Sequence, residues 1–183
     1  MPHRGFTVDR AATLAPGMMI EPLRHTDVQP QVLQDHVDAL FPNGVTQHGN
    51  NYFLAGNQAA TTVNPSIELL FEYVRRAAYP TAPSRFESVF ACETLDDARA
   101  FRASPVWGNP AAAIFEVETE SAAFRVDMTC LTLQGSILVA SYLANRYWRQ
   151  EPSELHLFGG PQTPPSWEVL LSPPVRVVGQ VDP

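Results

Sequence analysis

The stretch "PPSWEVLLSPPVRVV", residues 164–178, predicts two β-strands divided by Pro173 and Pro174, because proline has no backbone N–H to donate to a sheet. The first strand carries a single carboxylate, Glu168, in an otherwise apolar run. Side chains alternate across a strand, so Glu168 shares its face with Leu170. Alternation alone favours a Glu168 that points to solvent, as strand charges usually do. The alternative is that this face lines a cleft, where a rigid strand would aim the carboxylate.

Hydrophobic periodicity along the rest of the chain predicts an α+β protein. The clearest helix follows Asn64, which can cap it, with Pro65 in its first turn. Thr94 and Asp97 have the spacing of a capping box. Further strands are expected at 5–10, 18–22, 51–54, 88–92 and 112–119, and further helices at 31–41, 94–103 and 135–151.

The composition limits both the size and the partners of the protein. With 183 residues and 45% hydrophobic content, the chain can bury one substantial core. A net charge of -7 argues against non-specific binding to nucleic acid or anionic lipid. Cys92 and Cys130 are far apart and lack a CxxC partner, so a reducing compartment is expected. The first residues lack the apolar core of a signal peptide and no apolar stretch is long enough to span a membrane, which predicts a cytoplasmic location.

A second candidate for binding chemistry lies in "YPTAPSRFESVFACETLDDARAF", residues 79–101. Ser84, Arg85 and Ser88 stand just before and inside a predicted strand, which a capped helix follows. The guanidinium fork of Arg85 suits a diphosphate, and serine hydroxyls can bind ribose or amide groups. The alternative is a turn with solvent-facing polar residues, and spacing alone favours that alternative.

Four stretches, in their order and spacing, resemble an uncharacterised bacterial family related to the ADP-ribosyltransferase-like fold. They are the run 79–101, "IFEVET" at 114–119, "YLANRYW" at 142–148 and "WEVLLSPPVRVV" at 167–178. The resemblance covers about the last hundred residues and, loosely, the first strand. It implies a single domain over residues 1–183, in which residues 25–62 form a variable insertion of helix and loop.

The resemblance implies a split, bent, mixed or antiparallel β-sheet with flanking helices and with NAD, as substrate, in a cleft between its halves. Glu168 then matches the catalytic carboxylate of a late strand, and Ser84, Arg85 and Ser88 match the middle motif that holds the dinucleotide. Cleavage of the nicotinamide–ribose bond develops positive charge on the sugar, which a fixed carboxylate stabilises in the transition state. Tyr147 could stack on nicotinamide or adenine, although an aromatic residue at a helix end is more often core.

The first strand departs from the family, which has a His or Arg there. One alignment places Thr7 at that position and another places Arg4, and the sequence leaves both open. Arg4 could bind the phosphates or the nicotinamide amide, whereas Thr7 offers only a hydroxyl. Ser166 stands two residues before Glu168, where enzymes that modify arginine have Glu or Gln, so protein arginine is a less favoured acceptor.

The expected activity is transfer of ADP-ribose from NAD to a macromolecular acceptor, protein or nucleic acid, or hydrolysis of NAD. Such domains often serve as bacterial toxins or effectors, so an immunity protein is an expected partner. The first alternative is a catalytically inactive module of the same fold that binds NAD or another nucleotide. The second is an RNA 2'-phosphotransferase-like activity, which needs several cations, and only Arg85 and Arg4 are obvious candidates.

Other residue types carry weaker signals. The five histidines have no metal-ligand spacing, so no metal site is predicted. His36 falls at the edge of the apolar stripe of helix 31–41, which predicts a core-edge position, and His48 falls in a predicted loop. Cys92 and Cys130 have apolar neighbours and are interpreted as buried residues, not nucleophiles.

Overall fold

The computed structural model describes residues 2–55, 64–106, 108–133 and 135–183. These residues form an α+β structure, as predicted. The strands are β1 (His3–Asp9), β2 (Met19–Ile20), β3 (Val89–Ala91), β4 (Ala113–Thr119), β5 (Phe124–Asp127), β6 (Trp167–Leu171) and β7 (Val175–Asp182). The α-helices are α1 (Gln31–Leu40), α2 (Gln47–Gly49), α3 (Pro65–Ala78), α4 (Leu95–Ala103) and α5 (Ile137–Trp148). Shorter turns are the π-helix η1 (Asn50–Leu54) and the 3-10 turns η3 (Arg85–Glu87), η4 (Met128–Cys130) and η5 (Leu155–Phe158).

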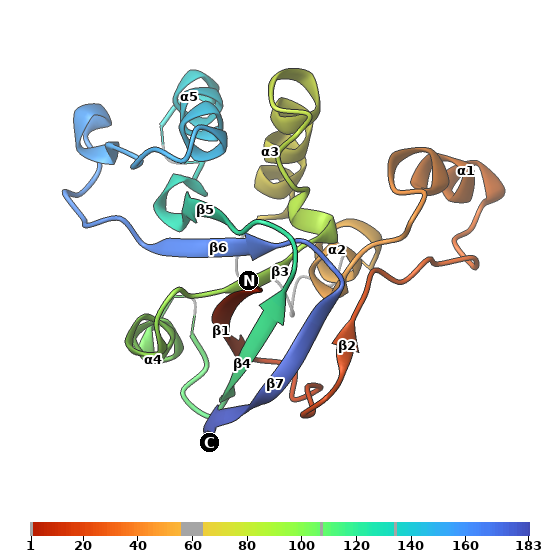
Figure 1. Ribbon diagram of the computed structural model, residues 1–183. Coiled ribbons are helices and arrows are strands. Elements are labelled where there is room, and N and C mark those ends of the chain that lie inside the picture. The colour runs from red at the N-terminus through yellow and green to blue at the C-terminus, as the bar shows by residue number, and fades with distance from the viewer. Residues whose placement is uncertain (1, 56–63, 107, 134) are drawn as a thin grey trace.

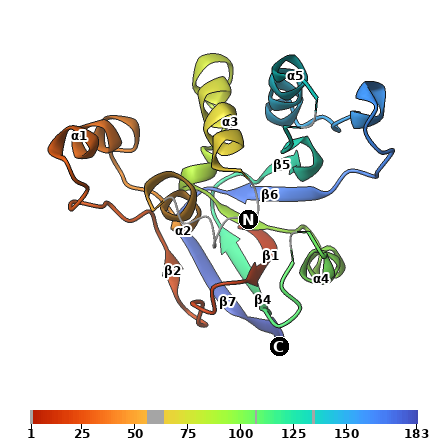
Figure 2. The same ribbon diagram turned by 180° about the vertical axis from the view of Figure 1, so that it is seen from behind.

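The strands form two antiparallel sheets, one in the order β1-β4-β7-β2 and the other in the order β3-β6-β5. Phe6 and Cys92 join the sheets by a pair of backbone hydrogen bonds of 2.9 and 2.8 Å. Gly5 permits this junction, because a Cβ there would lie 2.9 Å from the Cβ of Ala91. In Figures 1 and 2, α3 and α5 stand on one side of β6, and β4 and β7 extend away on the other side.

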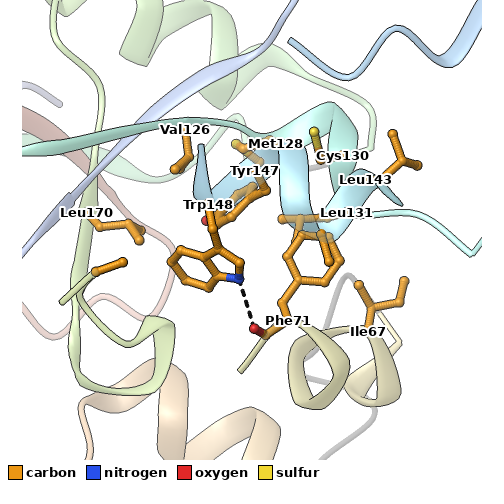
Figure 3. Packing of buried hydrophobic residues seen from close by; sticks show 12 residues of the cluster. Ile67, Phe71, Val126, Met128, Cys130, Leu131, Leu143, Tyr147, Trp148 and Leu170 are labelled. Atoms are coloured by element: carbon orange, nitrogen blue, oxygen red, sulfur yellow. Dashed lines mark hydrogen bonds between the residues drawn. The ribbon is translucent and has the colours of Figure 1, made fainter. Parts of the chain in front are cut away.

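Both faces of β6 are buried by the two main hydrophobic clusters. Leu170 packs into the cluster that α3, α5 and β5 share, which Figure 3 shows in part. In that cluster the indole Nε1 of Trp148 donates a 2.8 Å hydrogen bond to the carbonyl of Phe71. Val169 packs on the opposite face, against the other sheet. Glu168 is therefore 7% exposed, and the expectation from alternation alone that it faces solvent is wrong, because helices cover its face of the strand.

Local sequence signals at two helix starts are confirmed. The side chain of Asn64 accepts a 2.9 Å hydrogen bond from the amide of Ser66, and Pro65 is the first residue of α3. Thr94 caps α4 by accepting from the amide of Asp97 at 3.1 Å. Each helix of the described residues is too short or too polar to cross a membrane.

Predictions in the segment between β2 and α3 fit less well. Residues 51–54 were expected to form a strand and lie instead in the π-helix η1, and α2 occupies part of the expected loop before them. His36 is exposed, not at the core edge, because α1 is anchored by few buried side chains, Gln34 and Val37. Of the expected insertion at 25–62, residues 56–62 lie outside the described residues.

Candidate functional site

A cavity of about 490 Å³ opens where the two sheets meet. Its walls come from β1 and the turn after it, from α2 and η1, from η3 and β3, and from β6. This volume is within the range of small-molecule sites. The polar side chains that line it include Thr7, His48, Glu68, Arg85, Ser88 and Glu168.

Four buried side chains, Arg85, Glu68, Glu168 and Tyr147, form one hydrogen-bonded group at this cavity, here called the Arg85 cluster. The guanidinium of Arg85 donates twice to Glu68, from Nε to Oε2 at 2.7 Å and from Nη2 to Oε1 at 2.9 Å. Its Nη1 donates to Oε1 of Glu168 at 2.6 Å and to the hydroxyl of Tyr147. That hydroxyl donates in turn to Oε1 of Glu168 at 3.1 Å. The cluster therefore holds the carboxylate of Glu168 through one of its two oxygens.

Each member of the Arg85 cluster stands on a fixed element. Arg85 is the first residue of η3, Glu68 lies in the first turn of α3, Tyr147 lies in the last turn of α5, and Glu168 lies on β6. The fold brings together positions as far as 100 residues apart in the sequence, since Glu68 and Glu168 share one guanidinium. The geometry is thus set by packing of α3 and α5 on β6.

The entry of the chain into β6 is fixed by the buried carboxylate of Asp127. It accepts hydrogen bonds from the amides of Thr129 at 3.0 Å, Ser153 at 2.9 Å and Ser166 at 2.9 Å. The amide of Met128 also donates to the carbonyl of Ser166 at 2.8 Å. These bonds clamp the residues just before Trp167 and so position the strand that carries Glu168.

The electrostatics of the cluster are dominated by burial and by the guanidinium. Burial alone would raise the pKa of Glu68, but Arg85 and His48 outweigh it and hold that pKa well below its usual range. Burial would lower the pKa of Arg85, but Glu68 and Glu168 hold it well above its usual value. Burial raises the pKa of Tyr147 well above its usual value, so its hydroxyl stays protonated and can donate. By formal charge, two carboxylates and one guanidinium give the cluster one net negative charge.

The contacts of Arg85 differ in one respect from those expected of a diphosphate ligand. All three of its guanidinium nitrogens already donate to partners in the protein, and its side chain is 5% exposed. The guanidinium also packs 4.7 Å from the ring centroid of Phe90. It therefore lies at the cavity as expected, but its fork is directed at Glu68, not at a space where a diphosphate could bind.

The two serines predicted to bind the dinucleotide, Ser84 and Ser88, lie in different surroundings. Ser84 does not line the cavity; its hydroxyl donates to Glu72 at 2.9 Å and accepts from the amide of Phe86. Ser84 therefore lies outside the cavity where the dinucleotide was expected, with its hydroxyl engaged at the cap of η3 and by Glu72 of α3. Ser88 does line the cavity, and its hydroxyl donates to the carbonyl of Ser84 at 2.7 Å.

The ring of Tyr147 does not lie where it could stack on a ligand, as the sequence had suggested. Its side chain is fully buried, with the rings of Phe71 at 5.2 Å and Trp148 at 4.8 Å between centroids. Figure 3 shows this ring within the cluster between α3 and α5. A ligand in the cavity cannot stack on it, so the contribution of Tyr147 is its hydrogen bond to Glu168.

On the first strand, the structure distinguishes between the two alignments. Thr7 lines the cavity, whereas Arg4 does not. The side chain of Arg4 is 58% exposed and pairs with Glu116 at 2.9 Å and Glu118 at 3.4 Å on the other face of the sheet. Arg4 is therefore not a residue of this site, and the hydroxyl of Thr7 is what β1 offers.

Two residues of the site were not predicted from the sequence. Glu68 occurs with Glu72, Arg75 and Arg76 on one helix, a charge pattern that could have indicated internal ion pairs but gave no partner for Glu68. His48 lies in α2, with Nε2 3.3 Å from Oε2 of Glu68, although nothing in its local sequence indicated a site. Their assembly depends on tertiary contacts between segments of different predicted character.

The two cysteines are buried, as predicted. Burial raises the pKa of Cys92 to about 12 and raises the pKa of Cys130 further above its usual value, so both remain thiols at neutral pH. Across the described residues, no three His, Cys, Asp or Glu side chains gather in a way that could hold a metal ion.

Comparison with protein-family models matches residues 22–182 to a family described as "Protein of unknown function (DUF2441)". That match leaves out the cavity walls from β1, from the turn after it and from β2, and it includes Arg85, Tyr147 and Glu168. Among curated proteins, the comparison finds none that matches the chain. Because the family model covers most of the sequence, the chain belongs to the DUF2441 family.

Proposed function

We propose that this protein binds NAD in the cavity and cleaves the nicotinamide–ribose bond, passing ADP-ribose to a macromolecular acceptor or to water. The fold that we propose for this activity is the ADP-ribosyltransferase-like one, a split antiparallel sheet with its site at the junction. One observation carries the proposal: Glu168 is buried on a rigid strand beside the cavity, and only its Oε1 is engaged, by Arg85 and Tyr147. Within the described residues, Oε2 receives no hydrogen bond.

A carboxylate held in this way is suited to stabilise a glycosyl cation. As the bond between nicotinamide and ribose breaks, positive charge grows on the sugar ring, and Oε2 of Glu168 can interact with it or with the adjacent hydroxyl. Because Arg85 and Tyr147 fix the carboxylate beforehand, the site needs little reorganisation during the reaction. The interaction strengthens in the transition state, which is the condition for raising kcat.

The charge of the site favours one orientation of NAD. The Arg85 cluster carries net negative charge, which suits the cationic nicotinamide riboside end and disfavours the phosphates. Arg10 is exposed and lines the cavity from the turn after β1. We therefore propose that the diphosphate lies towards Arg10, and Thr7 and Ser88 are further polar groups that line the cavity.

The test is release of nicotinamide from NAD by the natural chain and by Glu168→Gln. Glu168→Gln should lower kcat about 100- to 1000-fold, the usual effect of removing one transition-state contact. Its affinity for NAD, measured by calorimetry, should change little. The matched control is Glu116→Gln, which removes a strand carboxylate that pairs with Arg4 outside the cavity.

Two outcomes would contradict the proposal. Equal release by the natural chain and Glu168→Gln would remove Glu168 from the mechanism. Absence of both NAD binding and nicotinamide release would exclude NAD as the ligand. Transfer to an acceptor is tested by incubating the natural chain and labelled NAD with protein and RNA from a bacterial extract. Labelling of a macromolecule counts as transfer only if Glu168→Gln abolishes it.

A catalytically inactive NAD- or nucleotide-binding module is the second candidate. The observation in its favour is that β1 presents Thr7 to the cavity, while Arg4 lies outside it. This candidate predicts NAD binding with no release or transfer by any variant. An RNA 2'-phosphotransferase-like activity is less favoured, because Arg85 is neutralised by two carboxylates and Arg4 is elsewhere.

The proposal extends to the cellular location and biological role of the protein. A cytoplasmic location, a role as a bacterial toxin or effector, and a neutralising immunity partner are all consistent with NAD cleavage, since loss of NAD harms a cell. Expression of the natural chain and of Glu168→Gln in a bacterial host provides the check. Growth inhibition by the natural chain alone would support the toxin role, and equal growth would contradict it.

A further inference from the structure

We propose that His48 and Glu68 form a second catalytic pair in the same cavity, in which His48 removes the proton from the nucleophile that attacks the ribose. This inference rests on the proposed cleavage of NAD and extends it to the acceptor side of the reaction. It assigns a chemical role to α2, a three-residue helix within the segment expected to be a variable insertion.

The ring of His48 is fixed in place by its neighbours. It stacks on Tyr52 at 4.4 Å between centroids with planes 23° apart, and it lies 4.5 Å from the ring of Phe90. Its side chain is 13% exposed and lines the cavity. The aromatic contacts restrict the imidazole to one orientation, as a proton acceptor requires.

The two nitrogens of His48 differ in their surroundings. Nε2 is sealed from solvent and lies 3.3 Å from Oε2 of Glu68, too poorly aligned to count as a hydrogen bond, so it has no hydrogen-bond partner among the described residues. Such contacts are often long or misaligned in ligand-free sites and tighten when substrate binds. With its proton on Nε2 and directed at Glu68, neutral His48 would have its lone pair on Nδ1, which is bonded to none of the described residues.

Arg85 connects this pair to the first carboxylate. Oε2 of Glu68 also accepts from Nε of Arg85, and Nη1 of Arg85 donates to Glu168. His48 and Glu168 therefore lie at the two ends of one buried chain of charges, both facing the same cavity. One end is suited to stabilise the ribosyl cation, and the other is suited to accept a proton.

The step balances without a further reactant. The oxygen of water, or of an acceptor hydroxyl, forms a bond to C1' of the nicotinamide ribose. The C1'–N bond breaks, and its electron pair leaves with nicotinamide, which becomes neutral. The proton of the attacking group moves to Nδ1 of His48, and the resulting imidazolium is stabilised by the buried carboxylate of Glu68.

The pH dependence follows from the groups that surround His48. Glu68 and Arg85 face it from α3 and η3, Tyr52 faces it from η1, and Glu168 lies across the cavity on β6. Asp9, Arg10, Cys92 and Tyr147 are further titratable groups at or directly behind the cavity wall. The reaction needs neutral His48 as the proton acceptor, so kcat should fall when acid protonates the imidazole.

The first test compares His48→Asn with the natural chain in nicotinamide release. His48→Asn should lower kcat about 100-fold, leave KM for NAD unchanged and abolish the acid limb of the pH profile. Added azide should restore nicotinamide release by His48→Asn, because this anion attacks C1' without losing a proton. His36→Asn is the control, since His36 is exposed on α1. Retention of the natural kcat and acid limb by His48→Asn, or no rescue by azide, would overturn the pair.

The second test needs no turnover. Nitrogen NMR of the free protein, with His48 assigned by comparison to His48→Asn, should show neutral His48 protonated at Nε2. Protonation at Nδ1 instead would overturn the pair even if NAD is cleaved. Loss of activity in Glu168→Gln with natural activity in His48→Asn would overturn this inference alone, whereas absence of NAD binding and cleavage by the natural chain would overturn both proposals.

Discussion

Helix α3 carries two buried carboxylates one turn apart, and a comparison of their surroundings separates structure from function. Glu68 belongs to the Arg85 cluster. Glu72 belongs to a second group, with Arg75, Arg76 and Ser84, here called the Arg75 cluster. Each carboxylate accepts two hydrogen bonds from one guanidinium: 2.7 and 2.9 Å from Arg85 to Glu68, and 2.9 and 2.8 Å from Arg75 to Glu72. The chemistry of the two pairs is the same.

The difference lies in where the remaining hydrogen bonds go. Arg75 donates to the carbonyl of Ala82 at 3.0 Å, and Arg76 donates to the carbonyl of Leu40 at 2.7 Å. The Arg75 cluster thus ends on backbone and ties α3 to its neighbours. The Arg85 cluster ends on Glu168, at a cavity. A buried ion pair is therefore not by itself a sign of function; a side-chain atom left without a protein partner beside a cavity is the more informative feature.

The largest expected effect is on stability, and it compares Arg85→Met with Arg75→Met. Arg85→Met leaves Glu68 and Glu168 buried without their guanidinium, which should lower the free energy of unfolding by about 3–5 kcal/mol. Arg75→Met leaves Glu72 paired with Arg76 at 2.6 Å and should cost only about 1–3 kcal/mol. Urea unfolding of the two variants measures the difference. Equal losses would show that the clusters have the same structural weight.

The next effect is the acid sensitivity that Glu68 confers. Its pKa is held well below the usual range in the folded state, while the unfolded chain has the ordinary value of about 4.3. Between these values the unfolded chain binds one more proton, so the stabilisation is complete above about pH 4.3 and is lost as the pH falls through that window. The slope is up to about 1.4 kcal/mol per pH unit. Glu68→Gln should remove this part of the acid slope, as urea unfolding at several pH values will show.

The control for that titration is the exposed pair of Asp38 and Arg24. A hydrogen bond from Arg24 lowers the pKa of Asp38, but the pair is exposed and is screened by salt. At high salt, Asp38→Asn should therefore keep the acid slope of the natural chain. A slope in Glu68→Gln as steep as that of the natural chain would contradict the assignment of a buried, ionised Glu68.

The smallest effect concerns the hydroxyl of Tyr147. Tyr147→Phe keeps the packed ring and removes the donor to Glu168, which should lower the free energy of unfolding by about 1 kcal/mol. The matched variant is Tyr79→Phe, which removes a 3.0 Å hydrogen bond to Asn145 at a partly buried position, where water can replace it. Its loss should be smaller, about 0.5 kcal/mol. A larger loss in Tyr79→Phe, measured by urea unfolding, would contradict the importance of the Tyr147 bond.

Most of the fold could be predicted from local patterns, and the failures have a common cause. The strands of the C-terminal stretch, the cap of α3 at Asn64 and the cap of α4 at Thr94 are confirmed, because each depends on neighbours in sequence. The segment around η1 was predicted wrongly, because its apolar residues pack on distant parts of the chain. Glu168 was placed at solvent by alternation, since a strand does not show what covers its second face.

The sequence by itself determined an α+β chain with a lone carboxylate on a late strand and an arginine before a middle strand, because hydrophobic period, capping and proline act over a few residues. Only the tertiary structure decided which groups meet. In the folded chain Glu68 pairs with Arg85, and His48 lies beside Glu68. Arg4 pairs with Glu116 outside the cavity, and Ser84 belongs to the Arg75 cluster. The physical reason is that burial and ion pairing act through space, so the partner of a charge is fixed by packing of distant segments.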